Sequence, residues 1–195
     1  EVVTAALLSI IIGWSWRDAL DAFVVTNSVM GAVFAACGGI LAWYRPRNPI
    51  GWLFVAAGLA HATTAAAAPA IQLLIEGNAP LTVQRLVVTA FAWSWPWSIG
   101  LCLPLALLLF PDGRPPSRRW LWIVLAVIVT APLFAIEMGA APQSSEPGVP
   151  IGYLTFAGYG ALQPLWTATE IRNLLALSLG LAALGVRYRR GSDVE

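Results

Sequence analysis

Six long apolar segments make up most of this chain, and all but one of the connections between them are short. The segments lie at about residues 2–16, 22–44, 50–71, 86–110, 120–139 and 165–186. A helix of about 20 apolar residues crosses the hydrocarbon core of a bilayer. The pattern therefore predicts an all-α membrane protein, a polytopic bundle of about six transmembrane helices that forms a single domain over residues 1–195.

Two of the predicted spans have unusual lengths. The first, 2–16, is short, and we interpret it as a span whose start lies before Glu1 in a longer chain. The fourth is longer than one crossing needs and contains Pro96 and Pro104. Because proline lacks an amide hydrogen and bends helices, we expect a kinked or tilted helix there.

The composition excludes a water-soluble domain. Hydrophobic residues make up 58% of the chain and charged residues 11%, whereas soluble domains carry about 25% charged residues. The predicted partner is the lipid bilayer, and the predicted localisation is the cell membrane, with multiple passes. Because the basic residues border the apolar segments and form no stripe with interleaved aromatics, we predict no nucleic-acid partner.

The basic residues predict the orientation of the bundle. Of the eleven, eight lie in three clusters that separate pairs of spans. Short loops rich in Arg stay on the cytoplasmic side of a membrane, so the three clusters mark the inner face and both termini are expected to be cytoplasmic. The clustered residues are Arg45, Arg47, Arg114, Arg118, Arg119, Arg187, Arg189 and Arg190, and the remaining three are Arg17, Arg85 and Arg172.

The first two of these clusters lie in connections that favour a tight turn followed by a helix. Asn48 is a good N-cap and Pro49 a good first helical residue, because proline needs no amide partner and its φ is preset. Pro-Asp-Gly at 111–113 favours a tight turn. The loops either set topology alone, with Arg near lipid phosphate, or act directly in signalling or docking. Their candidate residues are Arg45, Arg47, Asn48, Pro49, Asp112, Gly113, Arg114, Arg118 and Arg119.

The same two connections carry a family resemblance. RPRNPIGW at 45–52 and LLLFPDGRPPSRRW at 107–120 together resemble the N-terminal membrane module of actinobacterial sensor histidine kinases, and residues 187–195 resemble the segment that follows it. The resemblance covers about residues 27–195. It implies a longer protein, a histidine kinase that acts as a homodimer. Such a kinase has cytoplasmic dimerisation and ATP-binding regions, uses ATP and magnesium, and phosphorylates a cytoplasmic response regulator.

Catalytic and metal-binding motifs are absent from the sequence. No GxSxG, HExxH, Walker A or GxGxxG string occurs, and the chain has one histidine and two cysteines. Cys37 and Cys102 fall inside predicted spans, and their spacing indicates neither a disulfide framework nor a zinc site. The phospho-accepting histidine region and the ATP-binding motifs of a kinase are also missing. We therefore predict no catalytic residue, metal or cofactor within these residues.

Several polar residues lie inside or at the ends of predicted spans, where burial is costly unless a partner is present. His61 lies near the middle of the third span and is the best single candidate for sensing, although a hydrogen bond across a helix interface is favoured for it and for Asn27. At the outer span ends we expect ion pairs, such as Glu137 with Arg172 or Arg85 with Glu170. The full candidate set is His61, Asn27, Glu137, Glu170 and Arg172.

Aromatic and small residues suggest two further surfaces. Trp93, Trp95, Pro96 and Trp97 form either an interfacial aromatic belt or an apolar pocket opened by the proline kink, into which a hydrophobic signal or a lipid fits. Small residues at four-residue spacing predict close helix packing, within one chain in preference to between two protomers. They are Gly31, Ala35 and Gly39 in the second span and Gly58, Ala62 and Ala66 in the third. The long outer connection 140–164 is apolar enough over 149–159 to lie back on the bundle or on the membrane surface.

Topology and resemblance together favour one function. We expect a module that senses a signal at the membrane or outside it and passes it through the last span and residues 187–195 to cytoplasmic kinase regions. Two alternatives remain: a transporter-like or channel-like subunit, and a plain membrane anchor or assembly subunit. Against transport, no span holds a paired set of central charges.

Overall fold

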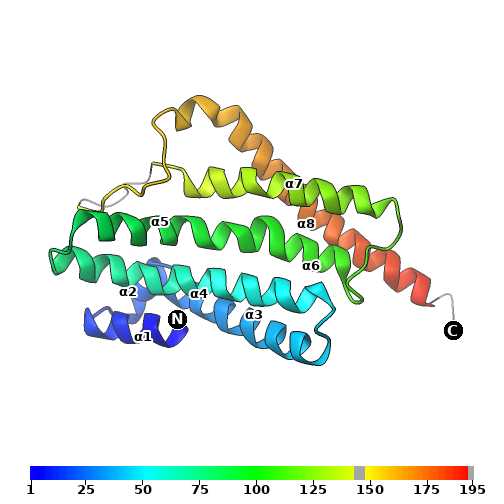
Figure 1. The fold of residues 1–195 in the computed structure, drawn as a ribbon, viewed down its shortest axis with the longest axis horizontal. Coiled ribbons are helices and arrows are strands. Elements are labelled where there is room, and N and C mark those ends of the chain that lie inside the picture. The colour runs from blue at the N-terminus through cyan, green and yellow to red at the C-terminus, as the bar shows by residue number, and fades with distance from the viewer. Residues whose placement is uncertain (143–147, 193–195) are drawn as a thin grey trace.

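The computed structural model describes residues 1–142 and 148–192. Residues 143–147 of the outer connection 140–164 and residues 193–195 of the C-terminal segment 187–195 lie outside these ranges. Every regular element in the described residues is a helix (Figure 1). In chain order these are α1 (Val2–Ile11), α2 (Trp16–Asp21), α3 (Val24–Tyr44), α4 (Pro49–Glu76), α5 (Leu81–Trp97), the π-helix η1 (Ser98–Cys102), α6 (Leu103–Leu109), α7 (Trp120–Gly139), the 3-10 helix η2 (Tyr159–Leu162) and α8 (Gln163–Ser192).

Five helical segments of the described chain are long and apolar enough to cross a membrane. They are Val24–Tyr44, Pro49–Glu76, Leu81–Leu109, Trp120–Gly139 and Tyr159–Arg189. The predicted fold class, an all-α polytopic membrane bundle, is therefore confirmed, and so is contact with a lipid bilayer. The assignment of one end to the cytoplasm stays a prediction.

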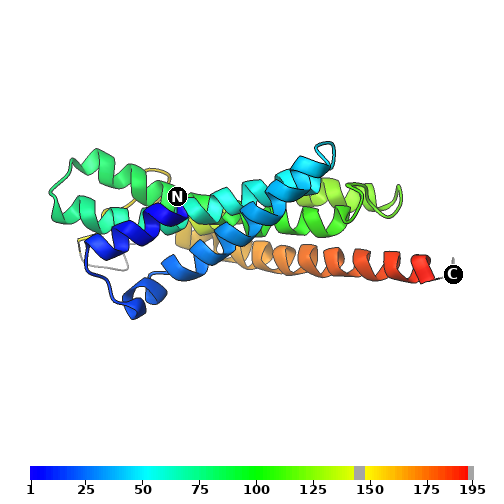
Figure 2. The ribbon, with the colours of Figure 1, turned by 90° about the horizontal axis from the view of Figure 1, so that it is seen from below.

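α4, α5, α6 and α7 lie along the longest axis of the molecule, and α8 crosses them obliquely (Figures 1 and 2). α4 is central, since it packs against α3 and α5 and also contacts α1 and α6. α7 lies against α5, and α8 packs on α6 and α7. The loops 45–48 and 110–119 and the C-terminal end of α8 lie at one end of the bundle, which we call the inner end. The opposite end, with the loop 77–80, is the outer end.

The first predicted span is shorter in the structure than the sequence pattern suggested. α1 has ten residues, a rise of about 15 Å, which is half of a hydrocarbon core. It ends before Gly13, whose φ is +72°, and Ser15 then starts α2 with a capping box to Asp18. The hydrogen bonds from Ser15 lower the pKa of the Asp18 carboxyl. Glu1 lies midway along the bundle, since Thr63 Oγ1 of α4 donates to its carboxylate at 3.3 Å.

Small residues bring α3 and α4 into backbone contact. A Cβ atom added to Gly58 would lie 2.5 Å from Ala35 N, and one added to Gly38 would lie 2.6 Å from Val55 N. The predicted packing of these faces within one chain is therefore confirmed. Gly39 is the exception, because nothing lies within 4 Å of a Cβ at that position.

Two clusters of buried apolar side chains hold the remaining helices together. The inner cluster joins α6, α7 and α8 through Leu105, Leu108, Val124, Val127, Ala176 and Ala183. The outer cluster joins α1, α2, α3 and α4 through Ala5, Ala19, Val24, Ala65 and Ala68. Between them, α5 continues through η1 into α6, so Pro96 and Pro104 interrupt the helix ladder without ending the span.

Candidate functional site

The two loops that carry the predicted motifs contact each other at the inner end. Asn48 is 7% exposed, and its Oδ1 accepts from Ile50 N at 3.1 Å, which caps α4 as the sequence predicts. Its Nδ2 donates to Pro111 O of the other loop at 2.8 Å. One side chain therefore starts a membrane span and fixes the neighbouring loop beside it.

Gly113 completes this loop contact from the other side. Its φ is +75°, and a Cβ there would lie 2.5 Å from Pro49 Cδ and 2.9 Å from Asn48 Oδ1. Only glycine fits at this position, because any other residue would have a strained backbone at this positive φ and its Cβ would have no room. The Asn48-Pro49 and Asp112-Gly113 motifs, more than sixty residues apart, thus form one contact surface.

We expect Gly113→Ala to lower the free energy of unfolding by about 2 kcal/mol, because the methyl group adds a clash to the cost of a left-handed backbone. Thermal unfolding in detergent micelles measures the loss. Gly13→Ala is the matched control, since Gly13 has a similar φ of +72° with nothing within 4 Å of a Cβ. Equal losses for the two variants would show that the loop contact contributes nothing.

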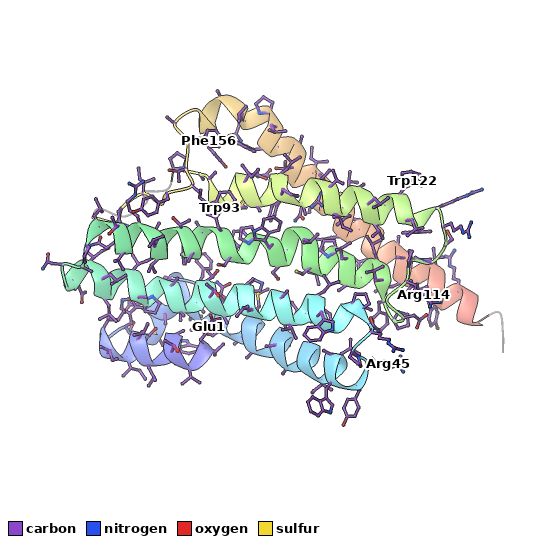
Figure 3. All side chains as sticks on the ribbon, in the orientation of Figure 1. Glu1, Arg45, Trp93, Arg114, Trp122 and Phe156 are labelled. Atoms are coloured by element: carbon purple, nitrogen blue, oxygen red, sulfur yellow. The ribbon has the colours of Figure 1, made fainter. Side chains whose placement is uncertain are left out.

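The last helix, α8, contacts the second of these two loops. Arg187 Nη2 of α8 donates to Arg114 O and lies 3.5 Å from Leu108 O. We call the three parts together, residues 45–49, residues 110–114 and Arg187, the inner-loop assembly. Figure 3 shows Arg45 and Arg114 at this end of the bundle. The exposed arginines around it are Arg45, Arg47, Arg114, Arg118 and Arg119.

His61 and Asn27 form a hydrogen-bonded pair across the α3–α4 interface. His61 is 2% exposed, and its Nδ1 lies 2.7 Å from Asn27 Oδ1. Asn27 Nδ2 donates to Phe23 O at 2.9 Å, so Oδ1 is the acceptor and His61 Nδ1 carries the hydrogen. His61 Nε2 is buried without a partner among the described residues. The favoured prediction of an interhelical bond is confirmed for both residues.

We expect Asn27→Ala to lower the free energy of unfolding by about 1 kcal/mol, the usual contribution of a hydrogen bond between membrane helices. The variant leaves His61 Nδ1 without its acceptor in an apolar interior. Detergent-titrated unfolding followed by circular dichroism measures the change. Thr26→Ala, at the exposed neighbouring position whose hydroxyl also donates to Phe23 O, is the control. A loss as large in the control would contradict the role of the pair.

Arg172 does not pair with Glu137, and that prediction is wrong. Arg172 extends from α8 to two neighbouring elements: Nε donates to Thr130 Oγ1 at 2.6 Å, Nη2 to Val127 O at 2.5 Å and Nη1 to Gly100 O at 2.9 Å. Gly100 O is free because the residue four positions on, Pro104, has no amide hydrogen. The guanidinium therefore joins α8 to α7 and to η1 through backbone oxygen atoms.

Glu137 is also held by neutral groups. It is 2% exposed, and Thr169 of α8 donates its hydroxyl to the Glu137 carboxylate. Tyr159 of η2 donates to the backbone oxygen of Glu137 at 2.7 Å. Glu170 is exposed and forms no ion pair with a described residue.

The other predicted outer ion pair is wrong as well. Arg85 donates through Nε to Ile151 O at 2.9 Å, and its guanidinium carbon lies 4.3 Å from the centroid of the Tyr153 ring. Tyr153 N in turn donates to Thr89 Oγ1 at 2.8 Å. Arg85 therefore fixes the outer connection onto α5, which confirms that residues 149–159 lie back on the bundle.

The tryptophans of the predicted cluster have different surroundings. Trp95 packs edge-on against Phe134 of α7 with ring centroids 6.2 Å apart, and Pro96 is fully buried. Trp97 is half-buried. Trp93 alone of the four lines a cavity of about 330 Å³ at the outer end. The cavity is thus beside the outer connection and not at the Pro96 kink.

Comparison with family models, curated proteins and solved structures finds no match. The resemblance to sensor-kinase membrane modules therefore stays a prediction. Among the described residues, no group of three or more His, Cys, Asp or Glu side chains could hold a metal ion.

Sequence reasoning missed the acceptors around Arg172 and the role of Thr169. One signal was available: Pro104 stands four residues after Gly100 and leaves its carbonyl free for a donor on another helix. Thr130 and Thr169 give no such signal, because a threonine hydroxyl in a membrane helix can bond to its own backbone. Thr130 Oγ1 does so, donating to Ala126 O at 2.6 Å.

Proposed function

We propose that this bundle is the sensing and anchoring module of a two-component sensor histidine kinase. In this proposal a signal at the membrane or outside it changes helix packing, and α8 passes the change to cytoplasmic kinase regions. Those regions would use ATP and magnesium, form a homodimer and phosphorylate a cytoplasmic response regulator. The resemblance of the two inner loops is the starting point of the proposal.

The observation that carries the proposal is the inner-loop assembly. Loops that only set topology need their arginines but need no contact with each other. Here Asn48 donates to Pro111 O, Gly113 packs on Pro49, and Arg187 donates to Arg114 O. α8 leaves the membrane at this assembly, so its position depends on the loops that connect the other spans. Transmission of a signal through α8 requires such a dependence.

The Arg172 contacts also support transmission from the outer end to the inner end through α8. Arg172 lies one turn from Thr169 and so connects the outer half of α8, which contacts Glu137, with η1 and the middle of α7. π-helical turns are frequent at functional positions in helices. A movement of α5 or α7 at the outer end therefore has a polar connection to α8 in addition to apolar packing.

The test uses the complete natural protein in membrane vesicles. Autophosphorylation from radiolabelled ATP is measured for the wild type, for Gly113→Ala and for its control Gly13→Ala. We expect Gly113→Ala alone to change the phosphorylation rate several-fold while the protein remains in the membrane. A protein that contains no kinase region, or one whose kinase activity is identical with and without residues 1–186, would sink the proposal and favour transport or assembly.

A further inference from the structure

A hollow of about 510 Å³ lies at the start of α7, at the inner end of the bundle. Four consecutive residues line it: Ser117, Arg118, Arg119 and Trp120. Its volume falls within the range of about 300–1,000 Å³ that is usual for ligand sites. Because α7 is one of the spans and begins at Trp120, the hollow lies where this end of the bundle meets the head groups of the bilayer.

The polar side chains in the wall of this hollow are available to a ligand. Arg118 and Arg119 are exposed, and neither guanidinium forms a hydrogen bond or an ion pair with a described residue. The side-chain hydroxyl of Ser117 has no partner in the described chain either. No carboxylate lines the hollow, and the one acidic residue of the loop 110–119, Asp112, lies outside its wall. The wall therefore carries two positive charges that no described residue neutralises.

The start of α7 adds to this positive potential. α7 has 20 residues and no acidic residue in its first turn, and its N-cap residue, Arg119, makes no side-chain capping bond. The aligned peptide dipoles give the N-terminus of a helix a partial positive charge. A capping carboxylate would offset that charge, and none is present here. The two guanidinium groups and the helix start together favour an anionic occupant.

The surface that continues from the hollow along α7 is apolar and exposed. Trp122 lies on α7 near the inner end (Figure 3), and it is exposed, as are Leu121, Leu125 and Val129. In a membrane span such a surface faces acyl chains. Trp120 packs against the inner cluster, which fixes the apolar side of the hollow. A lipid matches the charged hollow and the apolar surface together, whereas a soluble anion uses the hollow alone.

We propose that the hollow at residues 117–120 binds the phosphate of an anionic glycerophospholipid whose acyl chains lie along α7. Arg118 and Arg119 donate to the phosphate oxygens, an arrangement for which the planar guanidinium group is suited. Ser117 donates a further hydrogen bond. The head group beyond the phosphate carries no cation, because the wall has no carboxylate to receive an ammonium group. The inference does not depend on the proposed function.

Non-specific attraction is distinguished from this site by its dependence on position. An anionic leaflet attracts every basic residue near its surface, so it acts on all the exposed arginines of the inner end alike. Arg45 and Arg47 provide the same two charges at the same end, and they are exposed and lie outside the wall of the hollow. They are therefore the matched control for Arg118 and Arg119.

The experiment measures lipid binding to the purified full chain by native mass spectrometry. The protein is titrated in detergent with phosphatidylglycerol and, separately, with phosphatidylcholine of the same acyl chains. We expect the Kd for the first bound phosphatidylglycerol to be about ten-fold lower than that for phosphatidylcholine. In Arg118→Gln/Arg119→Gln we expect the Kd for phosphatidylglycerol to rise about 10- to 30-fold. In Arg45→Gln/Arg47→Gln we expect a rise of less than about three-fold.

A second double variant keeps both charges. Arg118→Lys/Arg119→Lys preserves the charge of the inner loop but removes the planar fork, and we expect the Kd for phosphatidylglycerol to rise about three- to ten-fold. This variant keeps the test valid if the glutamine variant does not fold, which circular dichroism in detergent checks. An affinity equal to wild type in the lysine variant would contradict phosphate binding by the two guanidinium groups.

The source of the phosphate is tested by competition with glycerol 1-phosphate, the soluble head group without acyl chains. We expect millimolar glycerol 1-phosphate to leave bound phosphatidylglycerol in place. Displacement would assign the hollow to a soluble phosphate compound and overturn the lipid assignment. Equal Kd values for the two lipids, or equal losses in the two glutamine variants, would reduce the site to general attraction by charge. None of these readouts involves a kinase, so their failure leaves the proposed function to its own test.

Discussion

Replacing Arg172 by lysine is expected to lower the free energy of unfolding by about 2–4 kcal/mol. Lysine keeps the charge in the span but has no planar fork, so it cannot reach Gly100 O, Val127 O and Thr130 Oγ1 together. At least one carbonyl oxygen then remains buried without its donor, at about 1–3 kcal/mol each. Equilibrium unfolding in mixed micelles, followed by circular dichroism, measures the loss.

Two further arginine variants separate the contacts from the charge. Arg172→Met removes the charge as well as the donors, so the difference between Met and Lys reports the cost of holding a cation in the span less the hydrogen bonds that lysine still makes. Arg17→Met removes an exposed arginine whose ion pair with Asp21 spans 3.9 Å, and we expect a change below about 0.5 kcal/mol. A wild-type stability for Arg172→Lys would show that the three oxygen contacts do not hold α8.

The second large effect is expected at Gly58. In Gly58→Ala the new methyl group would meet Ala35 N at 2.5 Å and Gly31 O at 2.9 Å, both backbone atoms that no side-chain rotation can move away. The helices α3 and α4 must therefore separate, and we expect a loss of about 3 kcal/mol. Separation also stretches the bond from His61 to Asn27, which lies on the same interface.

Gly39→Ala is the matched control for this substitution. Both variants raise helix propensity by the same amount, but nothing lies within 4 Å of a Cβ at Gly39. We expect Gly39→Ala to be neutral or slightly stabilising in the same unfolding assay. Equal behaviour of the two variants would contradict the close approach of α3 to α4.

Much of the fold is determined by local properties of the chain. The long apolar runs predict the spans, because a helix in lipid must satisfy its own backbone within a fixed thickness. Asn48 and Pro49 predict the start of α4 because capping involves only neighbouring residues. The grouping of the Arg clusters at one end can also be predicted from the sequence, because it depends only on how many spans lie between successive clusters.

The limits of sequence reasoning show first at the N-terminal segment. Residues 2–16 read as one apolar run, but the chain turns at Gly13, where φ is +72°. An apolar run shows that a segment is hydrophobic, but it does not show that the segment forms one continuous helix. The ten-residue α1 followed by α2 is therefore a result that hydropathy alone does not provide.

The sequence by itself determined an all-α membrane bundle, most of its spans, the gathering of arginines at one end and the Asn48 cap of α4. Only the tertiary structure decided that Arg172 bonds to Gly100 and Val127 in place of Glu137, that Asn48 contacts Pro111, and that Trp93 lines a cavity. The physical reason is that spacing along one helix fixes the face of a side chain, while its partner depends on which helix lies opposite and at what height. Those two quantities come from the packing of all the helices together.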